Sequence, residues 1–515
     1  MSTALESAAP LALDRADCYR ALSIRDARFD GRFFTGVKTT GVFCRPVCPA
    51  PLPKSGNCTF WRSAAAAQAA GFRPCLRCRP ESAPGTPAWR GTAASVSRAM
   101  LLIEDGALDH GGSVDELADR LGIGSRHLRR LFGQHLGATP RAVAKLRRSL
   151  FAKQLIDETK MSMTEIADSA GFSSQRRFNA CIREVYGRPP SALRRKNRQK
   201  KRTSSVRGEA RPASTGSDDD TSMIELSLAY RPPFAWDALL DFFRDRAIPG
   251  VEAVVDGRYL RTIRTRGGVG SIAVRHDEAR RRLRVSVCLS TPEGLIEITS
   301  RLRQLFDLDA DADAIDDVLA QKTMLRASVC GCPGMRVPGA FDGFETAVRG
   351  ILGQQVSVKG ATTVTGRVAA RWGTRLPRRR AQSEALAQVF PTARRLAQAE
   401  LEEVGIISAR AETIRGLARA VLADSSLLAP GKGLTQDIDR LVALPGIGPW
   451  TAHYLAMRVL REPDALPSGD LGLRKAISRA GEKPRPARDV ERALDAFRPY
   501  RAYAAMRLWS SLHPA

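Results

Sequence analysis

The apolar residues of this 515-residue chain follow different periodicities in successive stretches. The pattern is weakly helical over residues 18–34 and strand-like over 33–37, and an alanine-rich helix is predicted over 63–71. Residues 91–202 have a helical pattern throughout, with one long helix near 140–158. From Met223 to about Leu289, apolar and polar residues alternate as in half-buried strands, with one helix near 236–246. From about residue 291 the pattern is helical to the end.

These patterns predict a multidomain α+β protein, because the chain is too long for a single core. We expect a small cysteine-bearing domain over 1–90, an all-α domain over 91–196, an α+β subdomain over 223–305 and an α-helical domain over 306–515. A flexible linker is predicted over 197–222, where Pro, Ser, Thr, Gly and Asp dominate. Seven of the nine residues from Arg194 to Arg202 are basic, so this stretch either contacts phosphate or is a solvated tether.

The charge of the chain indicates which class of partner it binds. The net charge is +27, and the excess is shared: 37 basic and 21 acidic residues precede Met223, and 44 basic and 33 acidic residues follow from it. Such a field favours a polyanion, with nucleic acid ahead of a membrane surface. No apolar run of about 18 residues or more occurs and no signal peptide is recognised, so we expect a cytoplasmic, nucleoid-associated protein with no membrane partner.

Four of the ten cysteines form two close pairs, Cys44/Cys48 with three residues between them and Cys75/Cys78 with two. This spacing is typical of a tetrahedral Zn²⁺ site. The site is either a structural clip or a nucleophile, because four thiolates on one Zn²⁺ leave excess negative charge that keeps a sulfur reactive. Arginines crowd the two pairs, and we expect three of them to contact DNA: Arg45, Arg73 and Arg77.

Two stretches, TTGVFCRP over 39–46 and GFRPCLRC over 71–78, resemble the zinc domain of Ada-type adaptive-response proteins. The resemblance implies that Cys44 is both a zinc ligand and the irreversible acceptor of a methyl group from a DNA methylphosphotriester. It implies that Cys48, Cys75 and Cys78 are ligands only. Methylation of Cys44 removes one negative charge from the site, which is worth at most about 4 kcal/mol beside a phosphate.

An internal repeat occupies the helical region that follows. Two capping boxes, SVDE from Ser113 and SMTE from Ser162, each precede a Gly turn and a basic helix. A tight turn between a capped helix and a polar second helix is what a helix-turn-helix needs. The doubled unit resembles the AraC-type DNA-binding domain. We expect base or phosphate contacts from four residues of the two second helices: His127, Arg129, Gln175 and Arg176.

The stretch LPGIGPWTA over 444–452 places a Gly-rich hairpin between apolar helices. The glycines Gly446 and Gly448 let backbone N–H groups approach a phosphate, with a monovalent cation as a candidate at the turn. Asp470 follows in PSGDL, where it is either an N-cap or a functional carboxylate.

With FETAVRGILGQQVS over 344–357, these motifs resemble the AlkA-type 3-methyladenine DNA glycosylases of the helix–hairpin–helix superfamily. The resemblance implies that Asp470 is the catalytic carboxylate and that three aromatic residues line the base pocket: Trp450, Tyr454 and Trp509. Bifunctional relatives carry a lysine where Trp450 stands, so a monofunctional glycosylase is expected. Gln355 departs from the family, which has a wedge leucine at this position, and leaves the range of bases open.

The resulting hypothesis is a fused sensor and repair enzyme for alkylated DNA. Its predicted partners are double-stranded alkylated DNA, promoter DNA and RNA polymerase. An alternative is a zinc-stabilised transcription factor whose C-terminal domain binds DNA without catalysis. A third reading is an oxidation sensor at the four-cysteine site.

Overall fold

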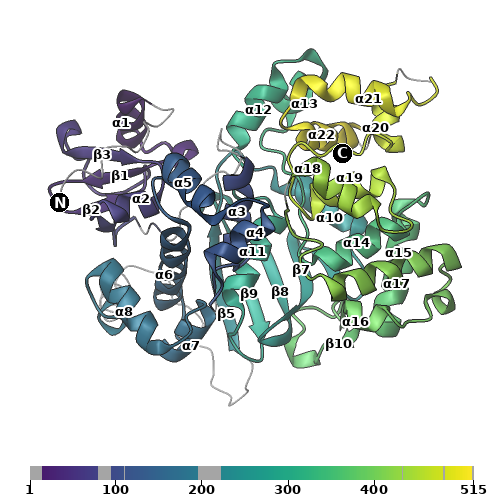
Figure 1. The fold of residues 1–515 in the computed structure, drawn as a ribbon, viewed down its shortest axis with the longest axis horizontal. Coiled ribbons are helices and arrows are strands. Elements are labelled where there is room, and N and C mark those ends of the chain that lie inside the picture. The colour runs from purple at the N-terminus through teal and green to yellow at the C-terminus, as the bar shows by residue number, and fades with distance from the viewer. Residues whose placement is uncertain are drawn as a thin grey trace.

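The computed structural model describes residues 14–78, 80, 94–109, 111–194, 222–431, 433–478 and 482–512 (Figure 1). Residues 197–221 of the predicted linker lie outside the described residues. None of the helices in the described part of the chain combines the length and apolar character that crossing a bilayer requires.

The N-terminal part is a small sheet that brings the two cysteine pairs together. After α1 (Arg15–Ser23), the strands β1 (Phe34–Val37), β2 (Val42–Cys44), β3 (Cys58–Trp61) and β4 (Arg73–Pro74) form a sheet in the order β3-β1-β2-β4, and α2 (Ala64–Ala69) lies between β3 and β4 in the chain. Strands β2 and β4 run parallel, with Val42 opposite Arg73 and Phe43 opposite Pro74. Because parallel strands end at the same edge, Cys44 and Cys75 emerge side by side.

The helices that follow include α3 (Ala94–Glu104), α4 (Val114–Arg120), α5 (Ser125–Leu136), α6 (Pro140–Glu158), α7 (Met163–Ser169) and α8 (Gln175–Tyr186). Both predicted capping boxes are present, from Ser113 to Glu116 and from Ser162 to Glu165. Each second helix ends at a glycine in the left-handed conformation, Gly137 or Gly187. The predicted repeat and the long helix α6 are therefore confirmed.

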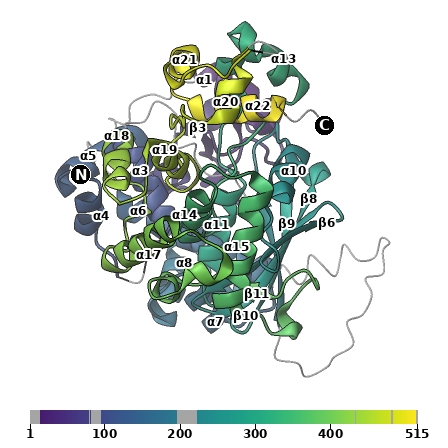
Figure 2. The ribbon, with the colours of Figure 1, turned by 90° about the vertical axis from the view of Figure 1, so that its right-hand side faces the viewer.

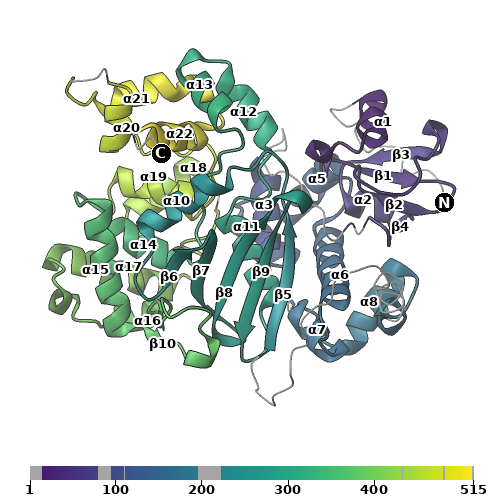
Figure 3. The same cartoon turned by 180° about the vertical axis from the view of Figure 1, so that it is seen from behind.

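The predicted alternating strands form one antiparallel sheet. It contains β5 (Ser222–Ala229), β6 (Glu252–Val255), β7 (Arg258–Thr265), β8 (Gly268–Asp277) and β9 (Arg282–Leu289) in the order β5-β9-β8-β7-β6, with α10 (Trp236–Arg246) between β5 and β6 in the chain. The sheet lies between two helical parts, with α6 and α7 beside β5 and with α14, α15 and α17 on the side of β6 and β7 (Figures 1 and 3).

The remaining chain is mainly helical. Its helices are α11 (Leu295–Leu305), α12 (Ala312–Ala320), α13 (Thr323–Gly331), α14 (Gly343–Leu352), α15 (Val358–Trp372), α16 (Ala393–Leu396), α17 (Ser408–Ala423), α18 (Leu434–Val442), α19 (Pro449–Arg458), α20 (Leu471–Ala476), α21 (Ala487–Leu494) and α22 (Arg501–Ser511). The expectation of helix to the end was wrong at one place. Strands β10 (Thr374–Arg375) and β11 (Gln388–Val389) pair after α15 ends at Trp372, and their two-residue length leaves no periodicity to detect.

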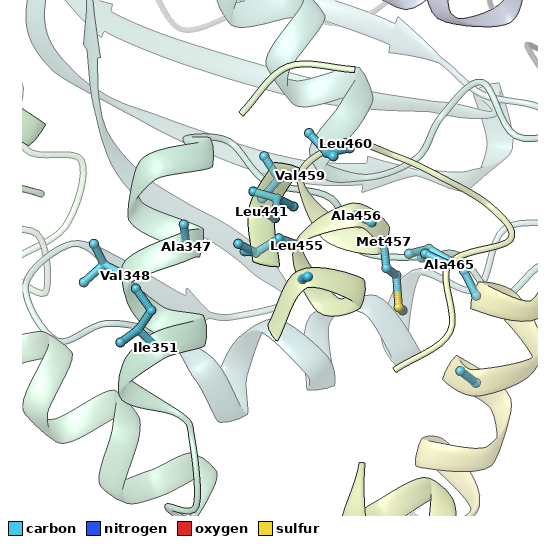
Figure 4. Packing of buried hydrophobic residues seen from close by; sticks show 14 of the residues in the cluster. Ala347, Val348, Ile351, Leu441, Leu455, Ala456, Met457, Val459, Leu460 and Ala465 are labelled. Carbon is cyan, nitrogen blue, oxygen red and sulfur yellow. The ribbon is translucent and has the colours of Figure 1, made fainter. Parts of the chain in front are cut away.

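The core of this part forms where α14, α18 and α19 meet. Ala347, Val348 and Ile351 of α14 and Leu441 of α18 pack around Leu455 and its neighbours on α19 (Figure 4). Helices α20, α21 and α22 gather with α13 at one end of the molecule (Figure 2). This packing fixes the two helices that carry the predicted pocket residues, α19 and α22.

The two halves on either side of the predicted linker are in contact. One continuous apolar cluster contains Phe34 and Phe43 of the first sheet, Leu155 of α6 and Leu226 of β5. Polar contacts also cross this boundary: Arg32 pairs with Asp311 at 2.8 Å, and both side chains are largely buried. The C-terminal half therefore packs against the N-terminal half in addition to being joined to it by the chain.

Candidate functional site

The four predicted zinc ligands lie together and buried. The Sγ atoms of Cys44, Cys48, Cys75 and Cys78 are all within 4.8 Å of one another. A tetrahedral site with Zn–S bonds of about 2.3 Å has sulfur–sulfur edges of roughly 3.8 Å, so the cluster needs only a small contraction. The four soft thiol donors and their mutual distances fit Zn²⁺.

Two of these sulfurs accept backbone N–H groups. The N–H of Arg45 lies 3.4 Å from Cys78 Sγ, and that of Arg77 lies 3.4 Å from Cys75 Sγ. Because a hydrogen bond to a thiolate stabilises its charge and lowers its nucleophilicity, these two contacts make Cys75 and Cys78 less reactive than they would be without a donor.

The arginines that flank the cysteine pairs are oriented differently. The Arg45 guanidinium pairs with the buried Asp30 carboxylate and donates to the Cys78 carbonyl at 3.2 Å, so it faces inward. Arg73 and Arg77 are exposed. Of the three, Arg73 and Arg77 are therefore the ones whose charge faces solvent.

The predicted contacts of the helix-turn-helix lie on the outer faces of α5 and α8. His127, Arg129, Gln175 and Arg176 are all exposed. The opposite faces are buried, with Leu128 and Phe132 on α5 and Phe178 and Ile182 on α8. The nearest partners of Arg129 are Ser125 at 3.3 Å and Asp115 at 3.9 Å, both on the surface, so its guanidinium is accessible to a phosphate.

The Asp470 carboxylate is held on both oxygens by indole N–H groups. Trp509 Nε1 donates to Oδ1 at 2.8 Å, and Trp450 Nε1 donates to Oδ2 at 3.1 Å. Oδ1 also accepts the backbone N–H of Leu473 at 3.0 Å and so caps α20. Asp470 therefore caps α20, and this role is compatible with its second predicted role as a functional carboxylate.

Trp450 and Tyr454 form a stacked pair one helical turn apart on α19, with ring centroids 5.6 Å apart and planes inclined by 12°. The Tyr454 hydroxyl accepts a hydrogen bond of 2.7 Å from Arg458. Burial alone would raise the pKa of Tyr454, but Arg458, Arg246 and Arg349 outweigh it and leave the pKa below its ordinary value. The structure brings all three predicted pocket aromatics to Asp470, directly or by stacking.

Gly472 was missed by the sequence reasoning. A Cβ on Gly472 would lie 2.9 Å from Asp470 Oδ1 and 3.1 Å from Trp509 Cδ1, so the absence of a side chain lets the indole approach the carboxylate. The DLG sequence that begins at Asp470 carries no signal for this contact, because Trp509 comes from another helix.

The two hairpin glycines have different surroundings. Gly446 has φ of +83° and faces Thr413, whose Oγ1 would lie 2.0 Å from an added Cβ. Gly448 has φ of −85°, and an added Cβ would meet no atom of the described chain within 4 Å. The protein itself therefore requires glycine at 446, whereas no atom of the described chain requires it at 448.

Gln355 lies at an exposed turn after α14 with φ of +56°. Its neighbour Gln354 ties this turn to the hairpin, because Gln354 Nε2 donates to the Gly446 carbonyl at 3.1 Å and to Thr451 Oγ1 at 2.9 Å. The sequence reasoning missed Gln354. The structure thus places the predicted wedge position and the hairpin on one connected surface.

Comparisons with known proteins cover nearly the whole chain. Four family models match: the metal binding domain of Ada over residues 17–81, a helix-turn-helix domain over 117–196, the AlkA N-terminal domain over 225–342, and the HhH-GPD superfamily base excision DNA repair protein over 348–499.

Three curated relatives match different shares of this chain. The chain is 41% identical over 499 residues to a probable bifunctional transcriptional activator/DNA repair enzyme AlkA of Mycobacterium tuberculosis, with 96% of each chain covered. It is 32% identical to DNA-3-methyladenine glycosylase 2 of Escherichia coli, over 55% of this chain and 96% of that protein. It is also 32% identical to the bifunctional transcriptional activator/DNA repair enzyme Ada of Escherichia coli, over 33% of this chain and 46% of that protein.

Proposed function

Because this chain belongs to the family of bifunctional Ada/AlkA-like transcriptional activators and DNA repair enzymes, we propose that it repairs two kinds of alkyl damage and reports one of them to transcription. Its N-terminal part takes a methyl group from a DNA methylphosphotriester. Its C-terminal part hydrolyses the N-glycosidic bond of alkylated purines such as 3-methyladenine. The observation that carries the second activity is the Asp470 carboxylate held between two indole N–H groups beside a stacked aromatic pair.

Base release uses the charge of the damaged base. Alkylation at N3 or N7 makes the purine cationic, so it leaves with the electron pair of the glycosidic bond and becomes neutral. The Asp470 carboxylate stabilises the positive charge that develops on the sugar, and water adds at C1′ and loses its proton. The Trp450–Tyr454 face offers a flat surface for a flipped cationic base. No lysine stands at Trp450, so the enzyme leaves an abasic site without strand cleavage.

Methyl transfer uses Cys44. Zn²⁺ bound by Cys44, Cys48, Cys75 and Cys78 would keep the sulfurs as thiolates at neutral pH. Cys44 Sγ forms a bond to the methyl carbon, the carbon–oxygen bond of the phosphotriester breaks, and the electron pair leaves with the phosphodiester oxygen. The backbone N–H groups donated to Cys75 and Cys78 lower the nucleophilicity of those two sulfurs, and the similarity to the metal binding domain of Ada supports Cys44 over Cys48. The thioether is stable, so each molecule reacts once.

The transcriptional output follows from charge. Methylation of Cys44 removes a negative charge from the part of the protein that carries the exposed Arg73 and Arg77. Because DNA is then repelled less, the exposed faces of α5 and α8 bind promoter DNA more tightly. RNA polymerase is the partner that a DNA-bound activator recruits. For the glycosylase part, the proposal also includes a monovalent cation bound at the Gly446–Gly448 turn.

One experiment tests both activities on the same sample. The zinc-loaded full chain is mixed with DNA treated with a methylating agent, Cys44 is analysed by mass spectrometry, and free bases are measured in the supernatant. We expect one methyl group on Cys44 and release of 3-methyladenine. A Cys58→Ser variant is the matched control, since Cys58 is buried outside the cluster. Unmodified Cys44 with wild-type zinc content would refute the methyl-transfer part.

The runner-up is a DNA-binding protein without catalysis. It predicts binding of alkylated DNA with no free base in the supernatant. Reversible zinc release by peroxide without methyl uptake would instead indicate an oxidation sensor.

A further inference from the structure

Arg458 occupies a buried position directly behind the aromatic pair. It is the last residue of α19, and it follows Trp450 and Tyr454 at intervals of four residues, so the three side chains share one face of the helix. Arg458 is only 6% exposed. It was not among the site residues predicted from the sequence.

The guanidinium of Arg458 is engaged on two sides. One nitrogen donates to the Tyr454 hydroxyl at 2.7 Å. On the other side, its Nε donates to the Pro338 carbonyl and the second terminal nitrogen donates to the Gly339 carbonyl at 3.2 Å. Residues 338 and 339 precede α14, so Arg458 ties the ring of Tyr454 to a segment outside its own helix.

A series of contacts leads from Tyr454 to the Asp470 carboxylate. Tyr454 stacks on Trp450, and the indole N–H of Trp450 donates to Asp470 Oδ2. An indole that rotates about its side-chain bonds loses this hydrogen bond, whereas a fixed neighbouring ring restricts the rotation. Side-chain orientation at the carboxylate therefore depends on how firmly Tyr454 is held.

We propose that Arg458 is a positioning residue for base release, which holds the Tyr454 hydroxyl and thereby aligns the Trp450 indole with the Asp470 carboxylate. This inference rests on the proposed glycosylase function. It assigns to Arg458 no contact with the substrate.

The charges that face Tyr454 provide a readout independent of activity. Arg458 of α19, Arg246 of α10 and Arg349 of α14 favour the phenolate, while burial and the Asp470 carboxylate oppose it. Removing the Arg458 guanidinium should therefore move the titration of Tyr454 to higher pH. The titration is followed by the ultraviolet absorbance of tyrosinate, as the difference between each protein and its Tyr454→Phe counterpart.

The functional test is a double-mutant cycle in the full chain, with single-turnover release of 3-methyladenine as the rate. Tyr454→Phe removes only the hydroxyl and keeps the contacts of Arg458 with residues 338 and 339, so it tests the bond even if Arg458→Met folds poorly. We expect each variant to lower the rate by about tenfold, as for loss of one hydrogen bond to a charged group. The double variant should be no slower than the slower single variant. Tyr500→Phe is the control, because Tyr500 is buried outside the pocket and should leave the rate unchanged.

Two outcomes would overturn the inference. One is a wild-type rate in Tyr454→Phe, and the other is multiplicative losses in the double variant together with an unmoved Tyr454 titration. If the wild-type protein released no alkylated base, the proposed function would fail, and the titration alone would still decide whether Arg458 controls Tyr454.

Discussion

The indole N–H of Trp509 lies 2.8 Å from Asp470 Oδ1, although the two residues are 39 positions apart in the chain. Trp509 belongs to α22 and Asp470 caps α20, so the contact exists only because these two helices pack together. The Asp470 carboxylate is thus oriented from two directions, since Trp450 of α19 donates to its other oxygen, Oδ2.

Replacing Asp470 with Asn should abolish base release without unfolding the protein. Asn is as good an N-cap as Asp, so α20 keeps its cap while the negative charge is lost. We expect a fall of at least about a hundredfold in the single-turnover rate, measured as 3-methyladenine released from methylated DNA. Asp470→Ala should lose the same activity and also about 1 kcal/mol of stability in urea unfolding. Wild-type excision by Asp470→Asn would show that the catalytic assignment is wrong.

Alanine at the two hairpin glycines should have opposite effects. Gly446→Ala forces a side chain into the left-handed region and against Thr413, so we expect a lower unfolding temperature. Gly448→Ala meets no atom of the described chain, so its stability should be unchanged while its affinity for DNA falls. Thermal unfolding and fluorescence anisotropy with a labelled duplex separate the two. If Gly448→Ala bound DNA like the wild type, the phosphate-approach interpretation of this turn would be incorrect.

Gly472→Ala should impair catalysis through geometry alone. Its Cβ would lie too close to Asp470 Oδ1 and to the Trp509 ring, so the indole must shift from the carboxylate. We expect slower base release and a changed tryptophan fluorescence spectrum, with DNA binding retained. Gly416→Ala on α17 is the matched control, since no atom lies within 4 Å of its added Cβ. Equal rates for the two variants would contradict the prediction.

The pH dependence of stability should contain a contribution from Asp307. Burial raises its pKa to about 6, against the opposing charge of Arg336, while Tyr503 donates to its carboxylate. A raised pKa means that the folded protein binds the proton more tightly. The stabilisation is therefore complete below about pH 4 and is lost as the pH rises through about 6, by up to about 3 kcal/mol.

Asp307→Asn removes this titration and keeps the positive φ of 50° that Asn tolerates. Urea unfolding followed by tryptophan fluorescence should show that the difference in stability between wild type and variant changes between pH 4 and pH 7. A constant difference would show that Asp307 does not titrate in this range.

Local patterns predicted most of the elements. The capping boxes, the long helix from Pro140 to Glu158 and the helix from Trp236 to Arg246 appear where periodicity and end signals placed them. The cysteine spacing likewise predicted the four-sulfur cluster, because two such pairs are the usual ligands of one Zn²⁺. The pairing of β2 with β4 is what brings the two pairs together. The strands β10 and β11 were not predicted, since two residues contain no period.

What the sequence determined by itself is thus the set of chemical groups and the local elements that carry them: two cysteine pairs, a doubled helix-turn-helix, a glycine hairpin and one carboxylate among aromatics. What only the tertiary structure decided is the direction of each group. Arg45 faces Asp30 and not solvent, Gly472 makes room for Trp509, and Arg458 holds Tyr454. The physical reason is that these contacts join residues of different elements, and their distances depend on how whole helices and strands pack, which no local pattern encodes.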